Sequence, residues 1–340
     1  MRIVRRAALS AAILIAACNR GETGGKSDAP PVTVYCSVDE PFAREVLDVY
    51  ASRTSVKVSA IFDSEAGKTT GLVNRIRSEA RAGRPRADVF WSSELFNTIL
   101  LGREGLLEPY DSPAAQDIPR RYRDSEHRWT ALAVRGRVVT FEPARVTAED
   151  APRRWEDLAR PEFARQTVLA NPLFGTTRGH LAAMFALWGR DRARAWLTNL
   201  RDGGVQLADG NSAAVRAVLA GRAALACTDT DDVWLAQRGG ASLDLRYLDM
   251  GDGGTLLIPC SVAMIQGPGS PQAARELIDF LVSVEVERML AQSDSRNVPV
   301  REALRVELGM DWPPETKVDF AAVADAMEEA VAAAREILLR

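Results

Sequence analysis

Histidine, the commonest general base of hydrolytic enzymes, is scarce in this sequence. Two histidines occur in 340 residues, and neither an H-E-x-x-H zinc pattern nor a G-x-S-x-G nucleophile turn is present. Residues 63–71 (DSEAGKTTG) include GKTT without the spacing of a phosphate-binding loop, so we expect a polar rim of a ligand cleft, with Ser64 or Glu65 within reach of the ligand. Because hydrolysis requires a nucleophile with a positioned base, the sequence argues against an enzyme.

Positive charge is not in excess. The chain has 43 lysines and arginines against 46 aspartates and glutamates, a formal net charge of −3. This balance indicates that nucleic acid is not a partner. The composition, 46% hydrophobic and 26% charged, is that of a globular protein, and 340 residues suit two domains or one domain with two lobes.

Cysteine is scarce, with four in the whole chain. Cys36, Cys227 and Cys260 each lie in a strand-like apolar context. An odd number in an exported protein leaves at least one thiol unpaired, and we expect small buried residues rather than ligands of a soft metal.

The first 18 residues (MRIVRRAALSAAILIAAC) combine arginines with an apolar run that is too short to span a membrane. Their end, LIAAC, resembles a bacterial lipobox, which predicts a lipoprotein signal peptide at residues 1–18 and lipidation of Cys18. The alternative is a plain secretory signal with an incidental cysteine. Residues 19–31 are polar and contain glycine and proline, as expected of a flexible tether.

From residue 31 onward, short β-rich segments alternate with longer segments of helical periodicity. This order favours a parallel sheet with helices on both faces and ligands at the carboxyl ends of the strands. The first block predicts strands at 32–37, 56–62 and 87–93, and helices at 40–54, 69–83 and 94–105. The second predicts strands at 167–172, 205–209 and 223–228, and helices at 178–200 and 211–222.

Two long extended stretches, 129–143 and 253–267, are candidates for strands that cross between lobes. The last helices are expected at 271–292 and 318–340. The predicted fold is α/β with two lobes, 32–134 plus 258–300 and 135–257, on which the helices of residues 301–340 pack.

Three aspartates follow a predicted strand in the stretch ACTDTDDVW, residues 226–234. Because unpaired carboxylates are costly to bury, Asp229, Asp231 and Asp232 require water, a helix start, an arginine or a cation. One of them is expected to cap the helix that begins near VWLAQR. We expect at least one of Asp231 and Asp232 to contact a ligand.

Helix starts supply the opposite chemistry, because their exposed N–H groups and the helix dipole attract anions. FGTTRGH (residues 174–180) and Asn211–Ser212 begin two predicted helices, and Arg178 adds a guanidinium. His180 is expected to pack within its helix, and His127 to lie in a surface loop.

The order and spacing of several motifs resemble the bacterial extracellular solute-binding proteins of ABC importers, in particular the branch with ferric-iron-binding members. The motifs include VTVYCSVDEPFAREVLDVYASRTSVKV, ADVFWSSE, EGLLEPY, VRGRVVTFEP, GNSAAVRAVLAGRAAL and AARELIDFLVSVEVERMLAQ. The resemblance extends from residue 32 to the C-terminus. It implies a two-lobed periplasmic-binding-protein fold, joined by two crossing strands, with the ligand between the lobes.

The resemblance also implies metal ligands. The tyrosine pair that ligates iron in the family falls on Asp231 and Asp232, the family histidine on Asp39, and the family glutamate near Ser93, with Glu94 one position later. None of the tyrosine or histidine ligands is kept. Capping is the alternative role for Asp39 and the aspartate pair, and a solvated position in a first turn is the alternative for Glu94.

The family's anion site corresponds here to the turn at residues 175–180, with Thr177 and Arg178, and to Asn211 and Ser212. A family arginine that faces the cleft corresponds to Arg135.

These features predict a monomeric substrate-binding lipoprotein, held at a bacterial membrane by its lipid and located in the periplasm or cell envelope. Its partners would be the ABC permease, its ATPase and a small solute. We expect no tightly bound cofactor. The transported ligand is interpreted as iron(III), or another hard cation, with a synergistic anion. The alternative is a small organic zwitterion or cation such as an aminophosphonate, thiamine or a polyamine.

Overall fold

The computed structural model describes residues 31–63 and 70–339. The predicted signal peptide, Cys18, residues 19–30 of the tether, and Ser64 and Glu65 lie outside these residues. Within the described part, no helix combines the length and apolar character needed to cross a membrane.

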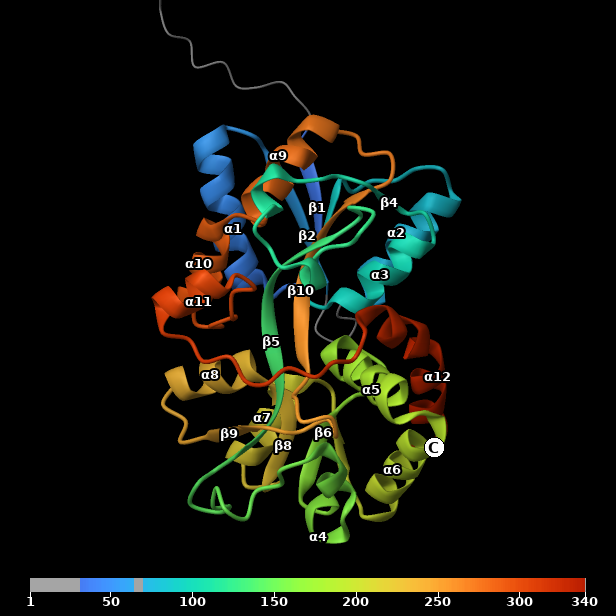
Figure 1. The fold of residues 1–340 in the computed structure, drawn as a ribbon, viewed down its shortest axis with the longest axis vertical. Helices are drawn as coiled ribbons and strands as arrows, with labels where there is room; N and C mark the ends of the chain where they lie inside the picture. The colour runs from blue at the N-terminus through green and yellow to red at the C-terminus, as the bar shows by residue number, and fades with distance from the viewer. Residues whose placement is uncertain (1–30, 64–69, 340) are drawn as a thin grey trace, which may run out of the picture.

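The first lobe is a sheet with helices on both sides (Figure 1). Strand β1 pairs in parallel with β2 and β3, and β10 joins β3 and the short β4 in the antiparallel sense. Its strands are β1 (Val32–Cys36), β2 (Val58–Phe62), β3 (Val89–Ser92), β4 (Leu107–Glu108) and β10 (Leu257–Ile265). Its helices are α1 (Glu40–Thr54), α2 (Thr70–Arg81), α3 (Leu95–Arg103), η2 (Pro113–Ala115), η3 (Arg120–Tyr122), α9 (Pro271–Leu281), α10 (Val284–Gln292) and α11 (Glu302–Leu308).

The second lobe repeats this plan. Strand β6 pairs in parallel with β7 and β8, and a separate small core forms between this sheet and α7 around Val138, Val168 and Val218. Its strands are β6 (Thr167–Ala170), β7 (Gln206–Ala208), β8 (Leu225–Asp229) and β9 (Asp244–Tyr247). Its helices are η4 (Trp155–Ala159), α4 (Pro161–Ala164), α5 (Gly175–Trp188), α6 (Arg190–Asp202), α7 (Asn211–Leu219) and α8 (Thr230–Arg238).

Strand β5 (Thr130–Phe141) joins the lobes. Residues 130–136 pair with β10, whereas residues 137–141 pair with β8 and β9, in each case antiparallel. The predicted crossing strand is therefore present, and it makes the sheet mixed rather than purely parallel. The partner changes next to Gly136, where a Cβ atom would lie 2.4 Å from Cε1 of Tyr247. A side chain at this position would force the tyrosine ring to move.

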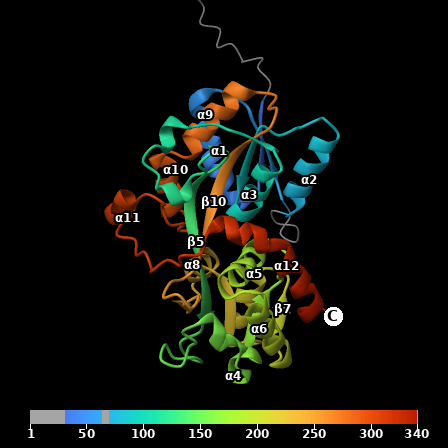
Figure 2. The same ribbon diagram turned by 45° about the vertical axis from the view of Figure 1, so that its right-hand side comes forward.

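The C-terminal helix α12 (Phe320–Leu338) packs against both lobes. It contacts α5 and α6 of the second lobe and α3 of the first, and Figure 2 shows it between them. Helix α5 also approaches the first lobe directly: a Cβ atom on Gly179 would lie 2.5 Å from the Phe96 ring. The lobes therefore meet through β5, through α12 and through this close contact.

Two predicted helices are each divided in the structure. The helix predicted at 178–200 belongs to α5 and α6, which are separated at Gly189, where φ is 81° and ψ is 163°. The helix predicted at 271–292 is α9 followed by α10, and the Ser283 hydroxyl accepts a hydrogen bond from the Val286 N–H at the new start. In both cases the helical apolar pattern continues through the break, so periodicity alone did not reveal it.

Candidate functional site

A cleft between the lobes collects strand ends and helix starts. Its cavity volume is about 50 Å³, enough for a few water-sized groups. The described residues that line it are Asp39, Ser93, Arg135, Ala170, Asn171, Phe174, Gly175, Thr176, Thr177, Asp209, Gly210, Asn211, Asp229 and Asp232. Six of the ten residues expected at the site lie in this lining, and Glu94, Arg178, Ser212 and Asp231 lie outside it.

Asp229 ends β8 opposite Arg137 of β5, and both side chains are buried. The Arg137 Nη1 lies 2.7 Å from the Asp229 Oδ1. The other carboxylate oxygen accepts hydrogen bonds from the Thr176 hydroxyl at 2.5 Å and the Asn211 amide nitrogen at 2.8 Å. The carboxylate is thus satisfied by an arginine and by the starts of α5 and α7, and it fixes both helix starts relative to the sheet.

Asp231 forms the second buried ion pair, with Arg135 Nη1 at 2.8 Å from its Oδ2. Arg135 and Arg137 are two residues apart on one strand, so their side chains leave the same face. Burial lowers the pKa of Arg135, but Asp231 and then Cys260, Asp229 and Asp39 raise it well above its usual value. The guanidinium therefore stays charged inside the cleft.

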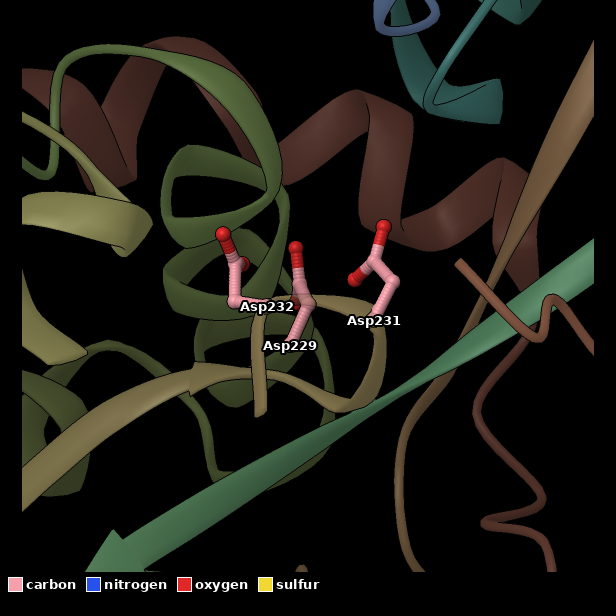
Figure 3. A group of neighbouring side chains, drawn as sticks. All are labelled: Asp229, Asp231 and Asp232. Carbon is pink, nitrogen blue, oxygen red and sulfur yellow. The ribbon is translucent and has the colours of Figure 1, made fainter. Parts of the chain in front are cut away.

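Asp232 follows on the first turn of α8. It accepts hydrogen bonds from the Ser212 hydroxyl at 2.8 Å and the Thr228 hydroxyl at 3.1 Å. Figure 3 shows Asp229, Asp231 and Asp232 where β8 passes directly into α8, with their carboxylates on the same side of the chain. One oxygen from each lies within 4.8 Å of the others, a spacing that could hold a metal ion. Among the described residues, Asp229 and Asp231 are thus paired with arginines, and Asp232 is hydrogen-bonded by a hydroxyl at the start of α7.

The starts of α5 and α7 face the cleft without a side-chain cap. Their first residues have Phe174 and Gly210 before them, which cannot accept hydrogen bonds through side chains. The first N–H groups of both helices therefore have no capping side chain, which is the condition for the anion site that the sequence predicts here. The Arg137 Nη2 also lies 3.4 Å from the Thr177 hydroxyl, which brings further positive charge to this position.

The first lobe contributes Asp39 and Ser93 to the lining. Asp39 precedes α1, and its side chain makes no capping hydrogen bond to that helix. Ser93 follows β3, and its N–H donates to the Ser37 hydroxyl at 2.9 Å. Both residues stand at carboxyl ends of parallel strands, where the alternating pattern predicted ligand contacts.

Glu94 is buried and acts as a helix cap rather than as a solvated acid. It accepts from the Phe96 N–H at 2.8 Å and the Asn97 side-chain amide at 2.6 Å. Burial raises the pKa of Glu94, while the Asn97 amide and then Arg178 oppose the rise. Arg178 is half-buried, and burial lowers its pKa while Glu94 raises it. Glu94 of the first lobe and Arg178 of the second thus shift each other's pKa, although neither residue lines the cleft.

Cys36, Cys227 and Cys260 are buried and none forms a disulfide, which confirms their expected role as small core residues. Burial raises the pKa of Cys227 to about 12. His180 is buried with its ring centroid 4.0 Å from that of Trp155, so it packs as predicted, and burial lowers its pKa. His127 is exposed.

The sequence did not single out Arg137 and Thr176, nor the lining residues Asn171 and Asp209. The Arg-Gly-Arg sequence in the predicted crossing strand could have indicated Arg137. Side chains two residues apart on a strand lie on the same face, so Arg137 lies on the same face as Arg135.

The fold and the cleft define a two-lobed solute receptor. The chain matches the family described as bacterial extracellular solute-binding protein over residues 85–326, and it belongs to that family. Members serve transport rather than catalysis, as receptors that bring a small solute to the permease and ATPase of an ABC importer, and a periplasmic location fits the family.

Relatives support this identification. The chain is 28% identical over 285 residues to a probable ABC transporter periplasmic-binding protein, y4fP, of Sinorhizobium fredii (78% of this chain, 77% of the relative). It is 28% identical over 285 residues to the major ferric iron-binding protein of Neisseria meningitidis serogroup A (82% of each chain). The ferric binding protein of Campylobacter jejuni has the same fold, with a TM-score of 0.80 and 21% identity over 90% of this chain and 99% of that chain.

Proposed function

We propose that this receptor captures a small organic zwitterion, with the anionic group at Arg135 and the starts of α5 and α7 and the cationic centre at Asp39 and Asp232. Arg135 carries the proposal. It is 4% exposed, it lines the cleft, and among the described residues nothing accepts a hydrogen bond from its Nε. An anionic group beside it would satisfy a buried donor and the uncapped helix starts together.

The arginine pairs favour an organic cation over a trivalent metal. Asp229 and Asp231 each have a guanidinium nitrogen within 2.8 Å. A ferric ion bound by these two carboxylates would lie close to two positive charges and would lack the tyrosine ligands of the family. Asp39 and Asp232 line the cleft, so an ammonium group would be placed next to these two carboxylates.

Iron(III), or another hard cation, with a synergistic anion is the second candidate. The close spacing of the Asp229, Asp231 and Asp232 oxygens and the ferric-binding names of relatives favour it. In that case the anion would occupy the helix starts and Arg135, and Asp39 would complete the oxygen ligands.

For the rest of the chain, we propose a lipid anchor at Cys18, a tether over residues 19–31 and a monomeric receptor. The proposed lobe boundaries are 32–134 plus 258–300 and 135–257, with residues 301–340 packed on both. The change of partners along β5 beside Gly136 supports a boundary near residue 135.

A thermal-shift comparison distinguishes the ligands. The mature chain is purified without added ligand, analysed by native mass spectrometry and for metal, and then titrated separately with 2-aminoethylphosphonate and with ferric iron plus bicarbonate. A ligand at about 100 times its dissociation constant stabilises the folded state by about 2.7 kcal/mol. We expect the aminophosphonate to stabilise wild type and Glu126→Gln, an exposed control, to the same extent, and to stabilise Asp232→Asn by only about half as much. Stabilisation by iron alone would overturn the zwitterion and support the second candidate.

A further inference from the structure

A second cavity lies on the first lobe, away from the cleft, where α3, η3 and the start of α12 meet. Its volume is about 540 Å³, within the range of small-molecule sites. The described lining consists of Ile99, Arg103, Arg120, Arg121, Arg123, Asp124, Ser125, Arg128, Trp129, Asp319, Phe320 and Ala321. Five arginines and two aspartates give this lining a formal charge of +3, on a chain whose net charge is −3.

Three of the arginines are held by protein groups. Arg103 pairs with Asp325 on α12, and Arg128 pairs with Asp124 at 2.6 Å. Arg121 pairs with Glu315 at 2.8 Å, and its guanidinium carbon lies 4.3 Å from the centre of the Phe320 ring. These contacts hold the three arginine side chains in place along the cavity wall, and each carboxylate neutralises the positive charge of its arginine.

Arg120 and Arg123 differ from the other three. Among the described residues, no carboxylate lies within ion-pair distance of either guanidinium. The Nε of Arg123 is buried and has no hydrogen-bond partner within the described chain. Two guanidiniums beside three further arginines repel one another, so an anion that bridges them would lower the free energy of the site.

The floor of the cavity is apolar, formed by the buried Ile99, Trp129 and Phe320. The first residues of α12 also lie at the cavity, with Asp319 capping the Ala321 N–H at 3.1 Å. Cationic walls over an apolar floor suit an anion carried on an apolar body, rather than a bare ion. The start of α12 is less available to an anion, because the Asp319 carboxylate already accepts a hydrogen bond from one of its N–H groups.

We propose that this cavity is a second ligand site, which binds a phosphate-type group attached to an apolar body through Arg120 and Arg123. Two sources share this chemistry, a soluble organic phosphate and the headgroup of an anionic phospholipid. The site is independent of the solute cleft, and no residue is shared between the two linings.

Calorimetry with phenyl phosphate tests the site in the full mature chain. The variant Arg120→Gln/Arg123→Gln removes the two arginines, and Arg81→Gln/Arg84→Gln removes the same charge from exposed positions outside the cavity. We expect the first variant to weaken binding at least tenfold and the control to match wild type. Equal affinity in all three proteins, or equal loss in both variants, would overturn the proposal.

Vesicle sedimentation then assigns the source. Wild type and the same two variants are mixed with phosphatidylcholine vesicles that contain or lack phosphatidylglycerol. Binding that requires phosphatidylglycerol and both cavity arginines assigns the headgroup, whereas phenyl phosphate binding without vesicle binding assigns a soluble phosphate. If neither probe binds wild type, the proposal is wrong. Thermal unfolding of the variants shows whether each is folded, because only cavity-specific loss in a folded protein supports the site.

Discussion

The two lobes contribute unequally to the cleft. Of the described lining residues, Asp39 and Ser93 come from the first lobe and Arg135 from the crossing strand, whereas the others come from the second lobe. The second lobe also contains the network in which Arg137 and Asp229 tie β5 and β8 to two helix starts. From this difference we expect the second lobe to be the preorganised platform of the site and the first lobe to be its cover.

The largest expected effect comes from breaking that platform. Arg137→Met leaves the Asp229 carboxylate buried without its guanidinium, which should lower the free energy of unfolding by about 3–5 kcal/mol. Urea denaturation measures the loss. The double variant Arg137→Met/Asp229→Leu should recover most of it, because an apolar pair removes the buried charge. A loss below about 1 kcal/mol in the single variant would contradict a structural role for the pair.

The first lobe contains a buried pair of a different kind. Arg301 lies 2.8 Å from Glu287 and 2.7 Å from Asp117, so its charge is shared. Burial raises the pKa of Glu287 to about 7, although Arg301 opposes this. The folded state then binds more protons than the unfolded state between the ordinary value of 4.5 and about 7.

The free energy of unfolding should therefore fall as pH rises through this window, by up to about 3 kcal/mol. Glu287→Gln should flatten that part of the pH profile, as measured by urea denaturation at a series of pH values. An unchanged slope in the variant would show that another group titrates. The same slope in Asp232→Asn and wild type would locate the effect in the first lobe.

Ligand affinity offers a more direct comparison between the lobes. Removing the charge of Asp232 should weaken binding of the zwitterion about tenfold, or about 1.4 kcal/mol. Asp39→Asn should cost less, because the second lobe supplies most of the cleft lining and the first lobe only a small part of it. Calorimetry with 2-aminoethylphosphonate measures both dissociation constants. A larger loss in Asp39→Asn would reverse the assignment of platform and cover.

The smallest effect is expected on the surface of α12. Glu329 pairs with Arg190 and Glu336 with Arg194, and all four side chains are at least one-third exposed. Glu329→Gln should change the free energy of unfolding by less than about 0.5 kcal/mol, because exposed ion pairs contribute little. A loss above about 1 kcal/mol would mean that charge, and not apolar packing, holds α12 to the second lobe.

Local signals explain what could be predicted. The helix expected at 40–54 matches α1, because Pro41 in the first turn and the apolar spacing both mark it. The helix start at Asn211 and the acidic stretch after β8 were likewise visible, since each depends on neighbouring residues, whereas α5 begins at Gly175, three residues before the predicted start at 178.

What could not be predicted depends on distant pairing. Arg137 meets Asp229 only through the β5–β8 register, across 92 residues. The sequence named the aspartates but not Arg137 as a partner. It offered ligand contact or a solvated first turn for Glu94, and not a buried cap, because nothing local shows that α3 begins inside the protein. Apolar residues at helical spacing occur both before and after Gly189. The pattern therefore did not reveal the end of α5, which is visible only in the backbone angles of Gly189.

The three buried thiols have a consequence for how this protein reaches its native state. Since Cys36, Cys227 and Cys260 form no bond to one another, the described fold requires no oxidation step. Its refolding yield should be the same with and without a reductant, and disulfide exchange among these cysteines should not limit the rate of folding. A receptor built in this way can mature in either a reducing or an oxidising compartment, which frees its assembly from the redox state of the cell envelope.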